Sequence, residues 1–217
     1  MQNLTLSDVD VDGAIGEAAE DAAGDSRADF FRKAGLATGG MLMASTVFGA
    51  LPAMAAGVPK GDVAILKYAL TLEYLEAAFY KEAVDSGKLT GAALEFAKVV
   101  ARDEAAHVTG LRKALGKNAQ ASPKFDFKGT TQANDVFLET AYVLENTGVK
   151  AYLGQAGKIK TPAILLTAAS IVTIEARHSG AVGQLIGKSI SPSGAYDVGA
   201  SMKAILKAVA GTGFIVS

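Results

Sequence analysis

The stretch Ala101-Arg102-Asp103-Glu104-Ala105-Ala106-His107 places a histidine three residues after a glutamate. On a helix, side chains at this spacing leave the same face, so Glu104 and His107 form a pair. The same spacing recurs in Glu175-Ala176-Arg177-His178, and these pairs use both histidines of the chain. Chance alone gives this on the order of once in four hundred cases. The repeated pair is therefore the strongest chemical signal in the sequence.

The composition favours a helical domain with a substantial core. Of the 217 residues, 50% are apolar, tryptophan is absent and only 5 are proline, which favours helices over strands. The absence of cysteine excludes disulfides, thiolate metal sites and iron–sulfur clusters. No clustered basic stripe is present, so we do not expect nucleic acid as a partner.

Residues 1–56 differ from the rest of the chain. Residues 1–26 are acidic and lack bases, so we expect them to be disordered. A short basic region then precedes an uncharged run that ends in Ala53-Met54-Ala55, an order typical of an export signal. An uncleaved membrane anchor is the alternative, because an uncharged run of this length can span a bilayer. We expect a leader at 1–56, a folded domain at 57–217 and an exported (periplasmic or extracytoplasmic) protein.

From Lys60 onward the apolar residues recur with helical periodicity. The pattern predicts four long helices at about 62–84, 90–115, 132–155 and 162–186, and a short one at about 198–209. The segment 117–130 has no helical stripe and is a long connection. Short, long and short connections between four helices predict an all-α, antiparallel four-helix bundle with one long crossover and a short C-terminal fifth helix.

Carboxylates interrupt the apolar stripes of these helices. Glu73 and Glu145 come from the first and third helices, and the two Glu-x-x-His pairs come from the second and fourth. Buried carboxylates are costly unless they are neutralised, and two divalent cations would cancel the charge of four. The set matches a known dinuclear pattern of helical bundles. We therefore predict a site for two divalent metal ions formed by Glu73, Glu104, His107, Glu145, Glu175 and His178.

Two of these glutamates have competitors nearby. Glu76 follows Glu73 by one helical turn, and we prefer Glu73 because it shares a stripe with Tyr80. Glu139 lies about 240° around the helix from Glu145, so we expect Glu139 to be a solvated charge.

Two tyrosines are predicted to face the same interior. We expect Tyr80 and Tyr142 to hydrogen-bond to the metal ligands, with ordinary aromatic packing as the alternative. Lys150 and Arg177 are expected at the surface.

These motifs resemble those of the ferritin-like superfamily, in particular its exported members with a twin-arginine-type leader. The segment 73–80, a glutamate with a tyrosine seven residues later, is similar to the family's first-helix motif. The two Glu-x-x-His pairs match its second and fourth helices, and Glu145-Asn146-Thr147-Gly148 resembles its third. Ala195-Tyr196-Asp197 is similar to the C-terminal region of the exported group. Ala28 stands where the leader's second arginine is expected.

The resemblance implies a di-iron or di-manganese site bridged by Glu104 and Glu175. Carboxylate and imidazole ligands suit Fe²⁺ and Mn²⁺. The implied activity is an oxidoreductase acting on O₂, peroxide or Fe²⁺, like a ferroxidase, peroxidase or catalase, in oxidative or metal stress. The alternative is a non-catalytic metal-binding or stress-protective bundle, including iron storage. A membrane is an expected partner only if the leader stays uncleaved, and assembly into a homo-oligomer stays open.

Overall fold

The computed structural model of the chain describes residues 57–216. The expected acidic segment and the export signal or anchor at 1–56 lie outside the described residues. Within 57–216 no helix has both the length and the apolar character needed to cross a bilayer. The described residues form five α-helices: α4 (Lys60–Asp85), α5 (Gly91–Leu115), α6 (Asn134–Ala156), α7 (Pro162–Leu185) and α8 (Met202–Thr212).

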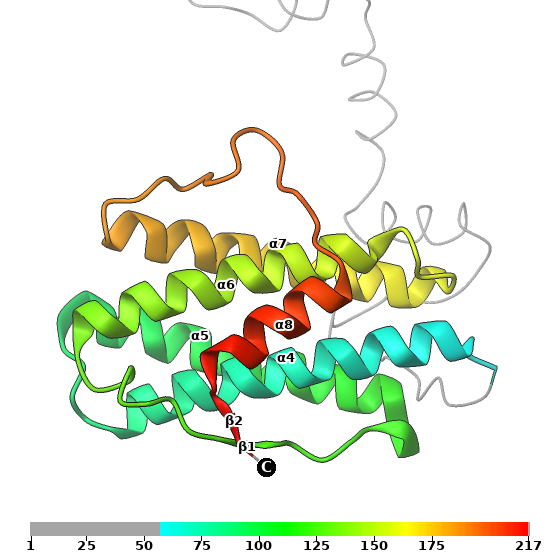
Figure 1. Cartoon of the computed structure of the whole chain (residues 1–217), viewed down its shortest axis with the longest axis horizontal. Coiled ribbons are helices and arrows are strands. Elements are labelled where there is room, and N and C mark those ends of the chain that lie inside the picture. The colour runs from blue at the N-terminus through cyan, green and yellow to red at the C-terminus, as the bar shows by residue number, and fades with distance from the viewer. Residues whose placement is uncertain (1–56, 217) are drawn as a thin grey trace, which may run out of the picture. The chain divides into compact units, whose positions relative to one another are not determined.

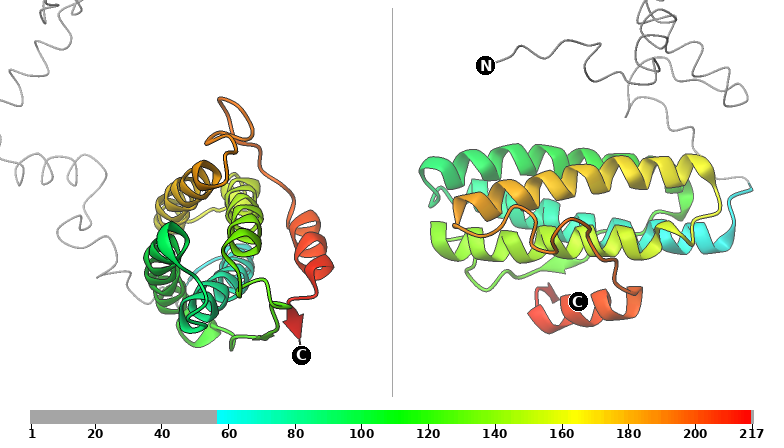
Figure 2. Two further views of the ribbon diagram at one scale, coloured as in Figure 1. Left: turned by 90° about the vertical axis from the view of Figure 1, so that its left-hand side faces the viewer. Right: turned by 90° about the horizontal axis from the view of Figure 1, so that it is seen from above.

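Four of these helices form a bundle. Helices α4 and α5 make one antiparallel hairpin, and α6 and α7 make a second. The connection between the hairpins runs along the length of the bundle (Figure 1), so α5 and α6 point in the same direction. Seen end-on, the four helices surround a common interior, with α8 outside them (Figure 2). The structure thus confirms the all-α four-helix bundle with one long crossover and a short fifth helix.

Helix boundaries follow the capping chemistry of the sequence. Helix α7 begins at Pro162 directly after Thr161, as expected for proline in the first turn. Buried Asp62 accepts the backbone N–H groups of Lys160 at 3.0 Å and Thr161 at 2.8 Å. The start of α4 is thereby tied to the start of α7. Helix α8 begins later than expected because the Ser201 hydroxyl caps it, accepting the N–H of Ala204 at 3.2 Å.

A small sheet joins the C-terminal segment to the crossover. Strand β1 (Lys124–Phe125) pairs antiparallel with β2 (Ile215–Val216). A 3₁₀ turn, η1 (Gly116–Asn118), separates α5 from the crossover. The sequence did not indicate these strands, because two residues are too short to show an alternating pattern.

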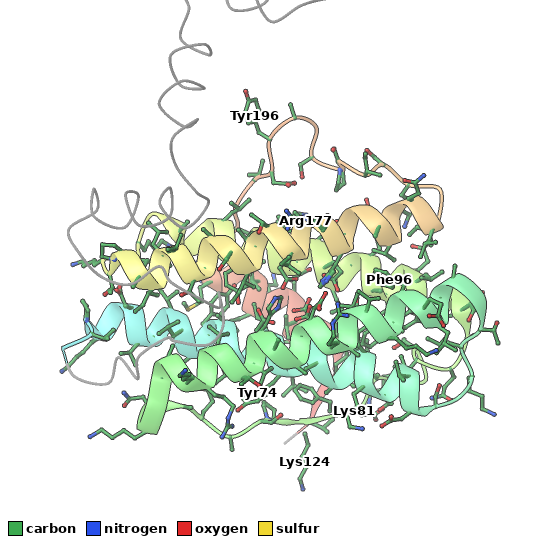
Figure 3. All side chains as sticks on the ribbon, turned by 180° about the vertical axis from the view of Figure 1, so that it is seen from behind. Tyr74, Lys81, Phe96, Lys124, Arg177 and Tyr196 are labelled. Carbon is green, nitrogen blue, oxygen red and sulfur yellow. The ribbon has the colours of Figure 1, made fainter. Side chains whose placement is uncertain are left out.

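Two buried apolar clusters fill the bundle interior and leave a polar layer within it. One cluster is rich in aromatic rings, with Phe79 stacked on Phe137 at a centroid distance of 5.4 Å. The other contains leucine and isoleucine residues of α4, α5 and α7, among them Leu70, Leu111 and Ile171. Arg177 lies on the outer side of α7, and Tyr196, 86% exposed, lies on the loop between α7 and α8 (Figure 3).

Candidate metal centre

The six residues predicted as ligands meet in the interior of the bundle. Each of their side chains belongs to a residue that is at most 6% exposed. They form two groups, in each of which one potential ligand atom per residue lies within 4.8 Å of the others. Both groups contain Glu104 and Glu175. The groups are Glu73, Glu104, His107 and Glu175, and Glu104, Glu145, Glu175 and His178.

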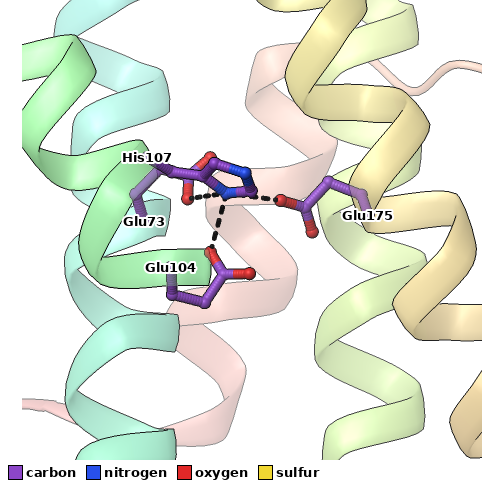
Figure 4. Close-up of side chains that lie close together, drawn as sticks. All are labelled: Glu73, Glu104, His107 and Glu175. Carbon is purple, nitrogen blue, oxygen red and sulfur yellow. Dashed lines mark hydrogen bonds and ion pairs between the residues drawn. The ribbon is translucent and has the colours of Figure 1, made fainter. Parts of the chain in front are cut away.

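The first group gathers around one ring nitrogen of His107. Its Nδ1 lies 3.2 Å from Glu73 Oε2, 3.2 Å from Glu104 Oε2 and 3.3 Å from Glu175 Oε1. These carboxylates come from three helices and converge on the imidazole (Figure 4). The spacing of Glu104 and His107, one turn apart on α5, places both on the inward face.

The second group repeats this geometry around His178 of α7. Its Nδ1 lies 3.2 Å from Glu104 Oε1 and 3.2 Å from Glu145 Oε2. The other ring nitrogen, Nε2, lies 3.3 Å from Asp103 Oδ2. When Nε2–H donates to that carboxylate, the lone pair of Nδ1 points toward the glutamates, where a cation would bind. Sequence reasoning missed Asp103, because its position before Glu104 looks like an ordinary helix-surface charge.

Two tyrosines orient the carboxylates of Glu73 and Glu145, each of which belongs to only one of the two groups. Tyr80 of α4 donates its hydroxyl to Glu145 Oε1, and Tyr152 of α6 donates to Glu73 Oε1. The expectation for Tyr80 is confirmed. The expectation for Tyr142 is wrong: within the described part of the chain no hydrogen bond joins its hydroxyl to a site residue. Its ring lies instead beneath the Lys188 ammonium, at 4.7 Å.

The site has an approximate two-fold symmetry that relates the two hairpins. Tyr80 follows Glu73 by seven residues on α4, and Tyr152 follows Glu145 by seven on α6. The Glu-x-x-His pairs of α5 and α7 correspond in the same way. Each hairpin therefore supplies two carboxylates, one imidazole and one hydroxyl.

Glu76 breaks this symmetry. Its side chain is buried, at 4% exposure, but the two groups of potential ligands contain Glu73 and not Glu76, in agreement with the choice of Glu73. The symmetry-related position on α6 is Gly148. A Cβ there would lie 3.5 Å from Glu76 Oε1 and 2.8 Å from Glu175 Oε2. The glycine thus makes room for an additional carboxylate.

Glu139 is placed as expected. It is exposed and forms an ion pair with Lys188 at the surface.

The carboxylates have strongly perturbed acidity. Burial raises the pKa of Glu104 to about 8, and the negative charge of Glu73 adds to the rise. Burial and the neighbouring carboxylates raise the pKa of Glu175 and of Glu76 well above the usual range. Burial also acts to raise the pKa of Glu73, but hydrogen bonds with His107 and Tyr152 bring it below its ordinary value.

The pKa values of both histidines are raised, whereas burial alone lowers the pKa of an imidazole. Burial acts to lower the pKa of His178, but hydrogen bonds to Glu104 and Glu145 raise it to about 11. The same competition raises the pKa of His107, through Glu104, Glu175 and Glu73. Protons thus neutralise part of the charge when no cation is present, and a metal ion must displace them.

The donor set suits divalent metal ions. Glu104 Oε1 and both oxygens of Glu175 are buried without a hydrogen-bond donor that meets standard geometry among the described residues, although such oxygens normally have a partner. Oxygen and imidazole nitrogen donors match Fe²⁺ and Mn²⁺. The residues therefore fit a dinuclear centre, in which Glu104 and Glu175 would be shared by the two cations.

Comparison with known protein families agrees with the fold and the site. A family model described as the ferritin-like domain matches residues 61–188, which include all six residues of the two groups. The chain therefore belongs to the ferritin-like domain family. A search of curated proteins gave no match.

Proposed function

We propose that the protein is a di-iron or di-manganese oxidoreductase that acts on O₂, peroxide or Fe²⁺. The observation that carries the proposal is the pair of four-residue groups sharing Glu104 and Glu175. Glu104 and Glu175 would each be shared by two cations, and such a pair would supply two-electron redox chemistry toward a small oxidant. The proposal extends to a role in oxidative or metal stress.

The protein's part in this chemistry is to hold and neutralise the cations. Tyr152 and Tyr80 each occupy one oxygen of a terminal glutamate, which leaves the other oxygen turned toward a histidine Nδ1. Asp103 accepts from Nε2 of His178 and orients that ring. Burial and the neighbouring carboxylates raise the pKa of Glu76 well above the usual range, so this carboxyl group retains a proton more readily than an ordinary glutamate.

Burial supports small substrates. The two bridging glutamates are 0% exposed, and His178 at 6% is the most accessible of the six. A centre of this kind excludes bulk water, which strengthens the electrostatic interactions inside it. Small oxidants and metal ions fit this enclosure, whereas a large polar substrate would have to open the bundle.

Metal loading tests the first half of the proposal. Metal-free protein is titrated anaerobically with Fe²⁺ or Mn²⁺, and bound metal per chain is measured by elemental analysis. We expect two ions per chain in the wild type and none in the double variant Glu104→Ala/Glu175→Ala. The matched control Glu95→Ala/Glu139→Ala removes two exposed glutamates and should bind two. A Glu104/Glu175 double variant that retains two ions would refute the assignment.

Turnover tests the second half. The loaded protein is mixed with O₂ or H₂O₂ in a stopped-flow instrument, and consumption is compared with that by the same concentration of free metal. We expect consumption well above free metal. Consumption at the free-metal rate would instead establish the alternative, a non-catalytic metal-binding bundle.

We also propose export, on the sequence of residues 1–56 alone. Cell fractionation of the full chain tests it, because an exported protein separates with the extracytoplasmic fraction. The full chain found only in the cytoplasm would overturn it.

A further inference from the structure

Glu76 is a buried carboxyl group that belongs to neither group of potential ligands. It lies on α4, one helical turn after Glu73, and is 4% exposed. Among residues 57–216 no hydrogen bond or ion pair joins its carboxyl group to another side chain. Burying a carboxyl group without such a partner costs free energy, so a function for Glu76 is to be sought in its surroundings.

Glu76 lines a small cavity between α4, α6 and α8. The cavity measures about 10 Å³, which is room for one water molecule or one bare metal ion. The space around it continues into solvent. Thr147, which is partly exposed, forms its outer end, and Glu76 is the only ionisable residue of the lining. The remaining lining residues are Leu72, Leu75, Leu144, Gly148 and Val209.

Gly148 connects this cavity with the metal centre. It lines the cavity, and a Cβ built on it would lie 3.5 Å from Glu76 Oε1 and 2.8 Å from Glu175 Oε2. Both carboxylates therefore lie against the same side of one glycine. Glu175 Oε2 is buried without a hydrogen bond among the described residues. A cation at Glu76 would thus lie beside a ligand of the centre, with no side chain from position 148 in between.

A divalent cation needs a carboxylate on its way into the bundle. Removing its hydration water in an apolar passage is costly unless oxygen ligands replace that water. Glu76 offers such oxygens, and no basic residue lines its cavity. The approach beside His178 differs, because Asp103 there forms an ion pair with Arg102 at 2.9 Å. The positive charge of Arg102 opposes an arriving cation.

We propose that divalent metal ions enter the centre through this cavity, and that Glu76 is the carboxylate that binds them in transit. An ion passes Thr147, binds to Glu76 and moves past Gly148 to Glu175. The carboxyl group of Glu76 releases its proton to water as the ion binds. The role rests on the metal centre of the proposed function, but not on its redox activity.

The rate of metal uptake tests the proposal. Metal-free protein is mixed anaerobically with Mn²⁺ in a stopped-flow instrument, and an indicator dye reports the loss of free Mn²⁺. Ions bound per chain at equilibrium are measured by elemental analysis. We expect Glu76→Gln to slow uptake by about tenfold or more, while two ions per chain still bind at saturating Mn²⁺. Glu95→Gln, which neutralises an exposed glutamate, is the control and should take up Mn²⁺ at the wild-type rate.

A second variant narrows the passage without changing a carboxylate. Thr147→Leu places a larger side chain at the outer end of the cavity and should also slow uptake without changing the number of ions bound. Thr140→Leu is the matched control. Both threonines lie on α6 and donate to the backbone carbonyl four residues earlier, but Thr140 does not line the cavity. Its uptake rate should match the wild type.

Two results would overturn the proposal while leaving the metal centre intact. One is uptake of two ions at the wild-type rate in both Glu76→Gln and Thr147→Leu, which would mean that ions enter elsewhere. The other is the loss of one ion per chain from Glu76→Gln at equilibrium, which would make Glu76 a resident ligand. Absence of any uptake by the wild type would instead overturn the proposed function together with this inference, so the two failures are distinguishable.

Discussion

The hydroxyl of Tyr152 on α6 donates to Oε1 of Glu73 on α4, while Oε2 of the same carboxylate lies 3.2 Å from His107 Nδ1. Tyr80 and Glu145 repeat the relationship in the opposite direction across the bundle. In Glu73 and in Glu145, one carboxylate oxygen therefore accepts a hydrogen bond from a tyrosine, and the other oxygen lies near a histidine Nδ1.

Replacing Tyr152 with phenylalanine should weaken metal binding. Without its hydroxyl, Glu73 loses the contact that orients it, and losses of this kind typically reduce metal affinity about 10- to 100-fold. Calorimetric titration with Mn²⁺ measures the effect. Tyr196→Phe is the control, because that side chain is 86% exposed on a loop. Equal affinities of wild type and Tyr152→Phe would contradict this role.

Asp103 should matter for the same reason on the other side of the centre. Asp103→Ala removes the acceptor of His178 Nε2, so the ring loses its preferred orientation. We expect metal affinity to fall by about tenfold or more, with little change in fold. Glu95→Ala, which removes an exposed partner of Lys98 on the same helix, should have no effect on affinity. If the two variants bind metal equally well, the contact is incidental.

Adding one methyl group at Gly148 should displace the Glu175 carboxylate. A Cβ there would lie 2.8 Å from Glu175 Oε2, so Gly148→Ala must displace that side chain. Overpacking of this kind costs about 1–3 kcal/mol, and we expect fewer than two ions per chain by elemental analysis. Gly61→Ala is the control, because nothing lies within 4 Å of its added Cβ. Full loading of Gly148→Ala would show that Glu175 adapts freely.

The metal-free protein should lose stability as the pH rises. The pKa of Glu104 is raised from 4.5 to about 8 and that of His178 from 6.5 to about 11. A raised folded-state pKa gives stability that is complete below the unfolded value and lost as pH rises through the folded one. We therefore expect the Tm of metal-free protein to fall between pH 5 and pH 9. Metal ions replace the protons, so loaded protein should not show this fall; a flat profile without metal would contradict the assignment.

Asp62 should stabilise the fold independently of the metal centre. Its carboxylate accepts two backbone N–H groups that precede α7, those of Lys160 and Thr161. Asp62→Ala leaves both without this acceptor and should lower the free energy of unfolding by about 1–3 kcal/mol, measured by urea denaturation. Asp85→Ala, in an exposed pair with Lys81, should change it by less than about 0.5 kcal/mol. Similar losses in the two variants would argue against the anchoring role.

Sequence periodicity was sufficient to predict the bundle and the buried positions of Glu73, Glu104, Glu145 and Glu175. Helical periodicity identifies the face of each helix that is buried. The two Glu-x-x-His motifs identify where along α5 and α7 the site lies. Tyr142 was chosen because its stripe was expected to face the interior, but its ring lies beneath the Lys188 ammonium. The actual bonds cross between helices, and the seven-residue spacing of Glu73 and Tyr80 would have identified Tyr152 on α6.

Other features depend on contacts that no local pattern encodes. Glu76 is accommodated only because Gly148 of another helix leaves space for it. Asp103 acquires its role from His178, which is distant in the sequence. Strands β1 and β2 exist because the C-terminal segment returns to the crossover. Each of these required the packed structure.

The two hairpins differ at a pair of corresponding positions, Glu76 on α4 and Gly148 on α6. This difference affects the order in which metal ions would enter the site. Glu76 has no counterpart at Gly148, so the two halves of the site contain unequal numbers of carboxyl groups. Ions placed in unequal surroundings bind with unequal affinities. Where two cations are bound, we therefore expect them to enter stepwise, at two different affinities.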